Sequence, residues 1–124
     1  MKVIIDHLDG NYVYCSTELG NLRGIWFGSL PLLHKKYTVE LGVQDVVSLS
    51  DIYQSGATEH KILCTGTEVC ITGFAEEYED DILFLRVGVD LVMIGTNPYE
   101  DFSSFCRKCA CITVQHVMLY DLGY

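Results

Sequence analysis

The stretch KKYTVELGV, residues 35–43, decides the class of fold because its polarity alternates with a period of two. The apolar positions of this alternation are Tyr37, Val39, Leu41 and Val43. The intervening positions are Lys36, Thr38, Glu40 and Gly42. Successive side chains of a strand point to opposite faces of a sheet, so the alternation predicts a strand with one buried face.

Further runs along the chain have the composition of strands. They are rich in Val, Ile, Thr, Tyr and Phe and are bounded by Gly, Asn or Asp, which favours strands over helices. They cover residues 11–16, 22–28, 60–66, 68–78 and 111–122. The apolar run 82–94 exceeds the usual length of one strand, so we interpret it as a hairpin with its turn at residues 88–90. Residues 68–94 are then expected to form a three-stranded meander.

One segment predicts a helix. In residues 96–108, Asn97 is a suitable N-cap and Pro98 suits the first helical position. Phe102 and Phe105 lie three residues apart, so on a helix they would share one face. We expect this face to close one end of the sheet.

These elements predict a single, mainly β domain over residues 1–124, with one short helix. The sheet is expected to be antiparallel and strongly bent, as an open barrel or a sandwich. No internal repeat and no linker is visible, and 124 residues suffice to bury one core. Residues 46–58 remain open between strand, short helix and loop. Unpaired sheet edges also leave homodimerisation open.

The charge is strongly negative, with 17 acids against 8 bases and a formal net charge of −9. Such a field repels phosphate and anionic lipid, so it argues against nucleic acid and membrane surfaces and favours a basic protein partner. The run 82–94 is interrupted by Arg86 and Asp90 and is shorter than the ~20 residues that span a bilayer. Asp6 and Asp9 stand where a signal peptide needs an apolar core. We therefore expect a cytoplasmic protein.

Three of the six cysteines lie together in CRKCAC, residues 106–111. Cys106 and Cys109 have the spacing of a zinc-binding pair, and Cys111 could add a third ligand, but no second CxxC motif completes the site. A redox pair is a second interpretation, although the motif falls at the C-terminal end of the predicted helix, where the dipole opposes a thiolate. The preferred interpretation is a set of cysteines that pack as small apolar side chains. Zinc is the one cofactor left open.

The acidic run EEYEDD is the clearest candidate for a binding surface. It consists of Glu76, Glu77, Tyr78, Glu79, Asp80 and Asp81. It has neither the spacing of a calcium loop nor the cleft that a general acid–base pair needs. We interpret it as a hairpin turn that is either simply solvated or a platform that docks a basic partner, with Tyr78 at its centre.

Aromatic and histidine residues give two weaker indications. If Ile25 and Phe27 face inward, Trp26 faces outward and is a candidate interface anchor. The histidines match no catalytic motif, and His116 alternates with apolar residues, so we expect it to be hydrogen-bonded on an apolar face. No catalytic residue is predicted.

In size, acidity, β architecture and lack of catalytic motifs, the whole chain resembles the immunity proteins of bacterial toxin and immunity pairs. This resemblance implies a small, non-catalytic cytosolic protein that neutralises a toxin domain by binding it. Two alternatives remain open. One is a small-ligand barrel or enzyme with His116, Cys64 or Cys70 at its mouth, and the other is a zinc-stabilised module built on CRKCAC.

Overall fold

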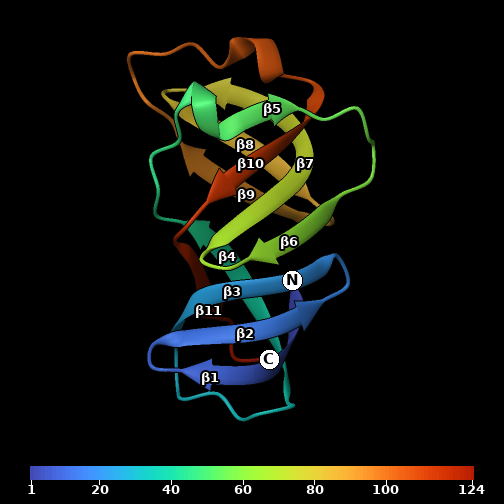
Figure 1. The fold of residues 1–124 in the computed structure, drawn as a ribbon, viewed down its shortest axis with the longest axis vertical. Coiled ribbons are helices and arrows are strands. Elements are labelled where there is room, and N and C mark those ends of the chain that lie inside the picture. The colour runs from blue at the N-terminus through green and yellow to red at the C-terminus, as the bar shows by residue number, and fades with distance from the viewer.

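The computed structural model describes residues 1–124, and almost all of its regular structure is β (Figure 1). Strands account for 61% of the residues and helical turns for 5%, which confirms the predicted mainly β class. The strands are β1 (Lys2–Asp9), β2 (Tyr12–Thr17), β3 (Gly20–Phe27), β4 (Lys36–Val43), β5 (Ile52–Gln54), β6 (Lys61–Thr65), β7 (Glu68–Glu79), β8 (Ile82–Val87), β9 (Asp90–Gly95), β10 (Lys108–Val114) and β11 (Val117–Asp121). The two 3-10 turns are η1 (Leu49–Asp51) and η2 (Ser103–Phe105).

A closed five-stranded barrel occupies the lower half of Figure 1. Strands β1, β2 and β3 form a meander, and β4 returns to pair with β1, which is a Greek key. Strand β11 closes the barrel because it pairs antiparallel with β4 and parallel with β3. We call residues 1–43 and 117–124 the first unit. Its closing strand comes from the far end of the chain.

The second unit, residues 44–116, is inserted between β4 and β11 and occupies the upper half of Figure 1. Strands β7, β8 and β9 form the predicted three-stranded meander, with its second turn at Gly88 and Val89. Strand β10 returns beside β7, so this unit is also a Greek key. Strand β5 pairs with β10. The segment before β5 is joined to the residue that follows β9 by a single parallel bridge, between Val47 and Thr96.

The two units repeat one backbone plan, in which residues 72–95 of the second unit correspond one by one to residues 2–25 of the first. The register of β1 with β2 after the bulge is repeated between β7 and β8. The register of β2 with β3 is repeated in full between β8 and β9. The β-bulge after Ile5 recurs after Ala75. No residue of 2–25 is identical to its counterpart in 72–95, so the repeat exists in the backbone and is not visible in the sequence.

A second detail supports the equivalence of the units. Just before β4, His34 has a left-handed backbone (φ 65°) and its N–H donates to the carbonyl of Ile5 at 2.6 Å. Just before β10, Arg107 has the same conformation (φ 64°) and donates to the carbonyl of Ala75 at 2.6 Å. Both segments therefore enter the strand that completes the Greek key of their unit through the same strained turn next to the bulge.

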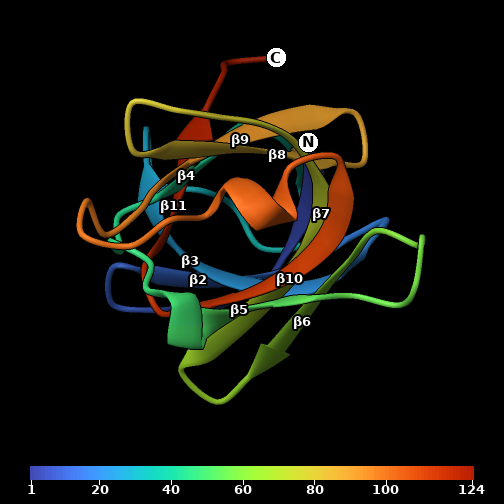
Figure 2. The same cartoon turned by 90° about the horizontal axis from the view of Figure 1, so that it is seen from above.

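The predicted α-helix over residues 96–108 is reduced to one 3-10 turn, η2. Local side-chain contacts compete with the helix, since Asn97 Oδ1 accepts from the N–H of Tyr99 and Asp101 Oδ1 accepts from the N–H of Ser103. The expected plug is nevertheless present. Phe102 is fully buried and η2 lies across the opening of the second unit (Figure 2).

Two other expectations need correction, and one open segment and one strand are added. Residues 111–122 are two strands, because the chain bends at Gln115 and His116 to pass from one unit to the other. The N–H groups of both bend residues donate to Asp45, and the side chain of His116 is exposed at this bend and does not lie on an apolar face. The open segment 46–58 contains a bridge, η1 and the short strand β5. Strand β1 was not expected at all.

One cluster of buried residues spans both units and fills the interior. It contains 24 side chains, and Trp26, Tyr37, Tyr78 and Phe105 pack against its margin. None of the helical turns has the length and hydropathy of a bilayer-spanning helix.

Candidate functional site

The acidic run is mainly strand, which corrects the expectation of a turn. Residues 76–79 complete β7, and only Asp80 and Asp81 make the turn to β8. Both have left-handed backbones, with φ of 52° and 60°, as a two-residue hairpin turn requires. Because strand side chains alternate, the run cannot present all of its residues to one partner.

Glu76 is held by an internal ion pair. It lies at the β-bulge, where its Oε1 accepts from Arg86 Nε at 2.7 Å and its Oε2 accepts from Arg86 Nη2 at 3.3 Å. The hydrogen bond from Arg86 keeps the pKa of Glu76 below its usual value. Glu76 is therefore already neutralised, whereas Glu77 and Glu79 are exposed and belong to no ion pair.

Tyr78 and Trp26 face inward, so the structure does not place either as an exposed interface anchor. Tyr78 packs on Phe102, with ring centroids 5.9 Å apart, and belongs to the margin of the core. Trp26 packs edge-on against Tyr37 at 5.1 Å, and its Nε1 donates to the carbonyl of Ser29 at 2.8 Å. Phe27 takes the outward place instead, at 44% exposure.

The outward side of the second meander is apolar at its centre and acidic along one edge. Opposite residues across an antiparallel pair share a face, so Glu77, Phe84 and Met93 form one row across β7, β8 and β9. We call this surface the meander face, and its residues outside any ion pair are Glu77, Glu79, Ile82, Phe84, Leu91 and Met93. Arg86 lies opposite Leu91 on the same face, where its charge is balanced by Glu76. Leu91 is 41% exposed and Met93 is 59% exposed, which is unusual for neighbouring large apolar side chains.

The apolar surface continues onto the first unit. Leu91 and Met93 line a groove of about 300 Å³ whose far side is formed by Met118 and Tyr120. The ring of Tyr120 stacks on Phe27 with centroids 5.0 Å apart. The groove has one acid, Glu40 of β4, so a continuous apolar strip runs between the acids of β7 and Glu40.

Sequence reasoning missed the apolar part of this surface because both faces of residues 82–94 are apolar. Leu83 and Leu85 are buried while Phe84 between them faces outward. In β9, Val92 and Ile94 are buried while Met93 is exposed. Arg86 is the one charged residue in phase with Ile82 and Phe84, so it alone could have indicated the outer face of β8.

The cysteines of CRKCAC do not form a metal-binding cluster with other side chains. Cys109 and Cys111 lie two residues apart on β10, and Cys106 precedes the strand. All six cysteines are free, and no group of three or more His, Cys, Asp or Glu residues is arranged to hold a metal ion. Cys111 is almost completely buried, which agrees with packing as a small apolar side chain.

Cys15 gives a testable pH dependence. Burial raises the pKa of its thiol from 9.0 to about 12, with a further rise from the charge of Asp6. The unfolded thiol ionises near pH 9 but the folded thiol does not, so the folded state binds more protons between these values and loses stability as the pH rises. We expect the wild type to lose about 2–3 kcal/mol more than Cys15→Val between pH 8 and pH 11, as measured by urea unfolding. Equal losses would contradict this assignment.

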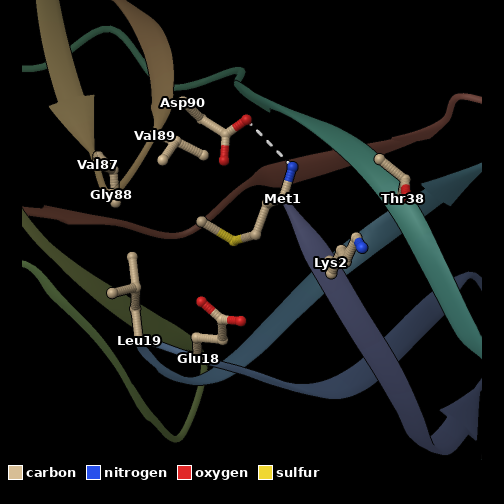
Figure 3. A pocket seen from close by; sticks show the side chains of 9 residues that line it. All are labelled: Met1, Lys2, Glu18, Leu19, Thr38, Val87, Gly88, Val89 and Asp90. Carbon is tan, nitrogen blue, oxygen red and sulfur yellow. Dashed lines mark hydrogen bonds and ion pairs between the residues drawn. The ribbon is translucent and has the colours of Figure 1, made fainter.

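A surface pocket of about 410 Å³ lies where Met1 meets the turn between β8 and β9 (Figure 3). The amino group of Met1 donates to the carbonyl of Val39 at 2.8 Å and to Asp90 at 3.1 Å. Lys2 and Glu18 supply other polar groups, but no Ser, Cys or His lines the pocket. The mouth residues expected for a small-ligand barrel, His116, Cys64 and Cys70, are not brought together here.

No family model, curated protein or solved structure matches this chain.

Proposed function

We propose that this protein is a non-catalytic binding module that engages a basic protein partner through the meander face. The observation that carries the proposal is the exposed apolar pair Leu91 and Met93, which continues into Phe84 and lies beside the unpaired acids Glu77 and Glu79. Protein interfaces typically have an apolar centre and a polar rim. The surface on the meander matches that anatomy.

The charge favours a partner of opposite sign. The net charge of −9 acts at long range, while the β7 acids and Glu40 lie on either side of the apolar strip. A basic surface approaching this face gains attraction before contact, and the apolar strip then supplies buried area. The proposal extends to an immunity protein that acts in the cytoplasm on a basic toxin domain, with six free cysteines suited to a reducing compartment.

The test is a comparative capture experiment. Wild type, Leu91→Glu with Met93→Glu, and a control with Leu63→Glu are immobilised and exposed to extract from the native organism. Leu63 is an exposed apolar residue on β6, outside the meander face. The proposal requires a basic protein that binds wild type and control but not the double variant. A partner retained equally by all three would exclude the meander face as the site.

The electrostatic part makes a separate prediction. Glu77→Gln with Glu79→Gln should lower the association rate for that partner about 5- to 10-fold at low salt, because steering of this kind changes rates by factors of roughly 10 to 1,000. The difference should shrink as ionic strength rises. Stopped-flow or surface-plasmon measurements across a salt series would show both effects.

The matched control for this prediction is Glu59→Gln with Glu68→Gln, which changes the net charge equally at exposed sites away from the face. If both pairs slow association alike, only the overall charge matters. The acids of β7 would then have no special role.

A further inference from the structure

The first unit carries its own version of the meander face, with different chemistry. The positions that correspond to the row of Glu77, Phe84 and Met93 are occupied by His7, Tyr14 and Arg23. This outer surface borders an open hollow of about 740 Å³. Residues from β1, β2 and β3 form the base, and the turn between β6 and β7 forms the rim.

Arg23 is ordered by stacking and keeps its donors free. Its guanidinium carbon lies 3.6 Å from the ring centroid of Tyr12 and 6.0 Å from that of Tyr14. No hydrogen bond or ion pair within the protein uses its N–H groups. A guanidinium held over a ring, with its N–H donors unused, is preorganised for a carboxylate or phosphate.

Asp6 and Asp9 add uncompensated negative charge to the same hollow. Asp6 lies at the β-bulge, the position that Glu76 occupies in the second unit. Glu76 is neutralised by Arg86, but the counterpart of Arg86 is Ser16, whose hydroxyl donates to Asp6 at 2.5 Å and brings no charge. Asp9 has no cationic partner either. The hollow thus offers acceptors for a cation.

We propose that this hollow binds a zwitterionic ligand, a short peptide with a free amino group and a free carboxylate. The ligand's carboxylate pairs with Arg23, its ammonium group lies against Asp6 and Asp9, and a side chain rests on the ring of Tyr14. A phosphate would be repelled by the two carboxylates, and a simple cation would be repelled by Arg23. The site therefore disfavours both. A ligand with both charges satisfies both halves.

The test titrates the full-length protein with the dipeptide alanyl-phenylalanine and follows backbone amide shifts by NMR. Two analogues serve as internal comparisons: the N-acetyl form lacks the ammonium charge, and the C-terminal amide lacks the carboxylate. We expect the free dipeptide to shift the amides of Tyr14, Asn21 and Arg23. It should bind about 10-fold more tightly than either analogue, because each analogue lacks one charged group and therefore one set of charge-assisted hydrogen bonds.

Two variants assign the charges to residues. Arg23→Gln should remove the preference for the free carboxylate over the amide, and Asp9→Asn should reduce the preference for the free amine. Lys61→Gln and Glu59→Gln make the same charge changes at exposed positions outside the hollow and should change neither preference.

Three outcomes would overturn the proposal. The first is equal binding of all three dipeptide forms, and the second is the absence of shifts around the hollow at millimolar dipeptide. The third is a response to the neutral disaccharide chitobiose that exceeds the response to the dipeptide, which would indicate a polyhydroxylated ligand. The comparisons on unaltered protein remain decisive even if a variant folds poorly.

Discussion

Met93→Glu is expected to weaken binding of the partner about 100-fold or more, as the loss of a central interface contact typically does. Met93 is the most exposed apolar residue of the meander face, and its side chain also lines the groove shared with Met118 and Tyr120. A carboxylate at this position would have to be desolvated against apolar side chains beside Glu77. That desolvation adds to the cost of the lost apolar contact.

The measurement is an equilibrium titration with the captured partner, accompanied by thermal unfolding of each variant. Met93 points away from the core, so Met93→Glu should unfold within a few degrees of wild type. Leu63→Glu is the matched control, because Leu63 is 56% exposed on a different strand. An affinity loss of similar size in the control would remove the meander face as a specific site.

Gly20→Ala is expected to lower the free energy of unfolding by about 3–5 kcal/mol, since it combines backbone strain with a steric clash. Gly20 has a backbone φ of 133°, which L-residues rarely adopt, and a Cβ there would lie 2.0 Å from the carbonyl oxygen of Ile62. That contact belongs to the parallel bridge between β3 and β6, one of the junctions between the two units. Neither backbone can move away without breaking this junction.

Chemical denaturation of Gly20→Ala and Gly66→Ala would separate the clash from the backbone strain. Gly66 also has a positive φ, 62°, but a Cβ there meets nothing within 4 Å. We expect Gly66→Ala to cost about 1 kcal/mol from strain alone. If the two substitutions proved equally mild, the close approach of β3 and β6 would be wrong.

The sequence predicted those parts of the fold where alternating polarity, or an apolar run interrupted by a turn residue, marks the strands. Alternation located β4, and the apolar run 82–94 with its glycine turn located β8 and β9. The repeated plan escaped notice because strand pairing, bulge position and turn geometry recur without one shared residue between 2–25 and 72–95. Backbone architecture of this kind leaves little trace in side-chain identity.

The candidate site was predicted only in part. The acidic residues were identified, but their division between an internal ion pair at Glu76 and an open edge at Glu77 and Glu79 depends on the bulge. A bulge shifts the alternation by one residue, and nothing in EEYEDD reveals where it occurs. The direction of Trp26 could not be predicted for a related reason, because its neighbours Ile25 and Phe27 are also apolar and gave no contrast.

The placement of β11 at the far end of the chain has a kinetic consequence. During synthesis, the first four strands emerge early but cannot close their barrel, since the whole inserted segment 44–116 separates β4 from β11. Joining such distant segments carries a larger entropic cost than forming local hairpins, so contacts of this range usually form late. Strands β6 to β10 of the inserted unit are consecutive in the chain, so their pairing can form while the barrel of the first unit is still open. Until residues 117–121 have been synthesised, the edges of β3 and β4 that pair with β11 are unpaired and can mispair with other strands. We expect chaperones to bind the nascent chain at these edges.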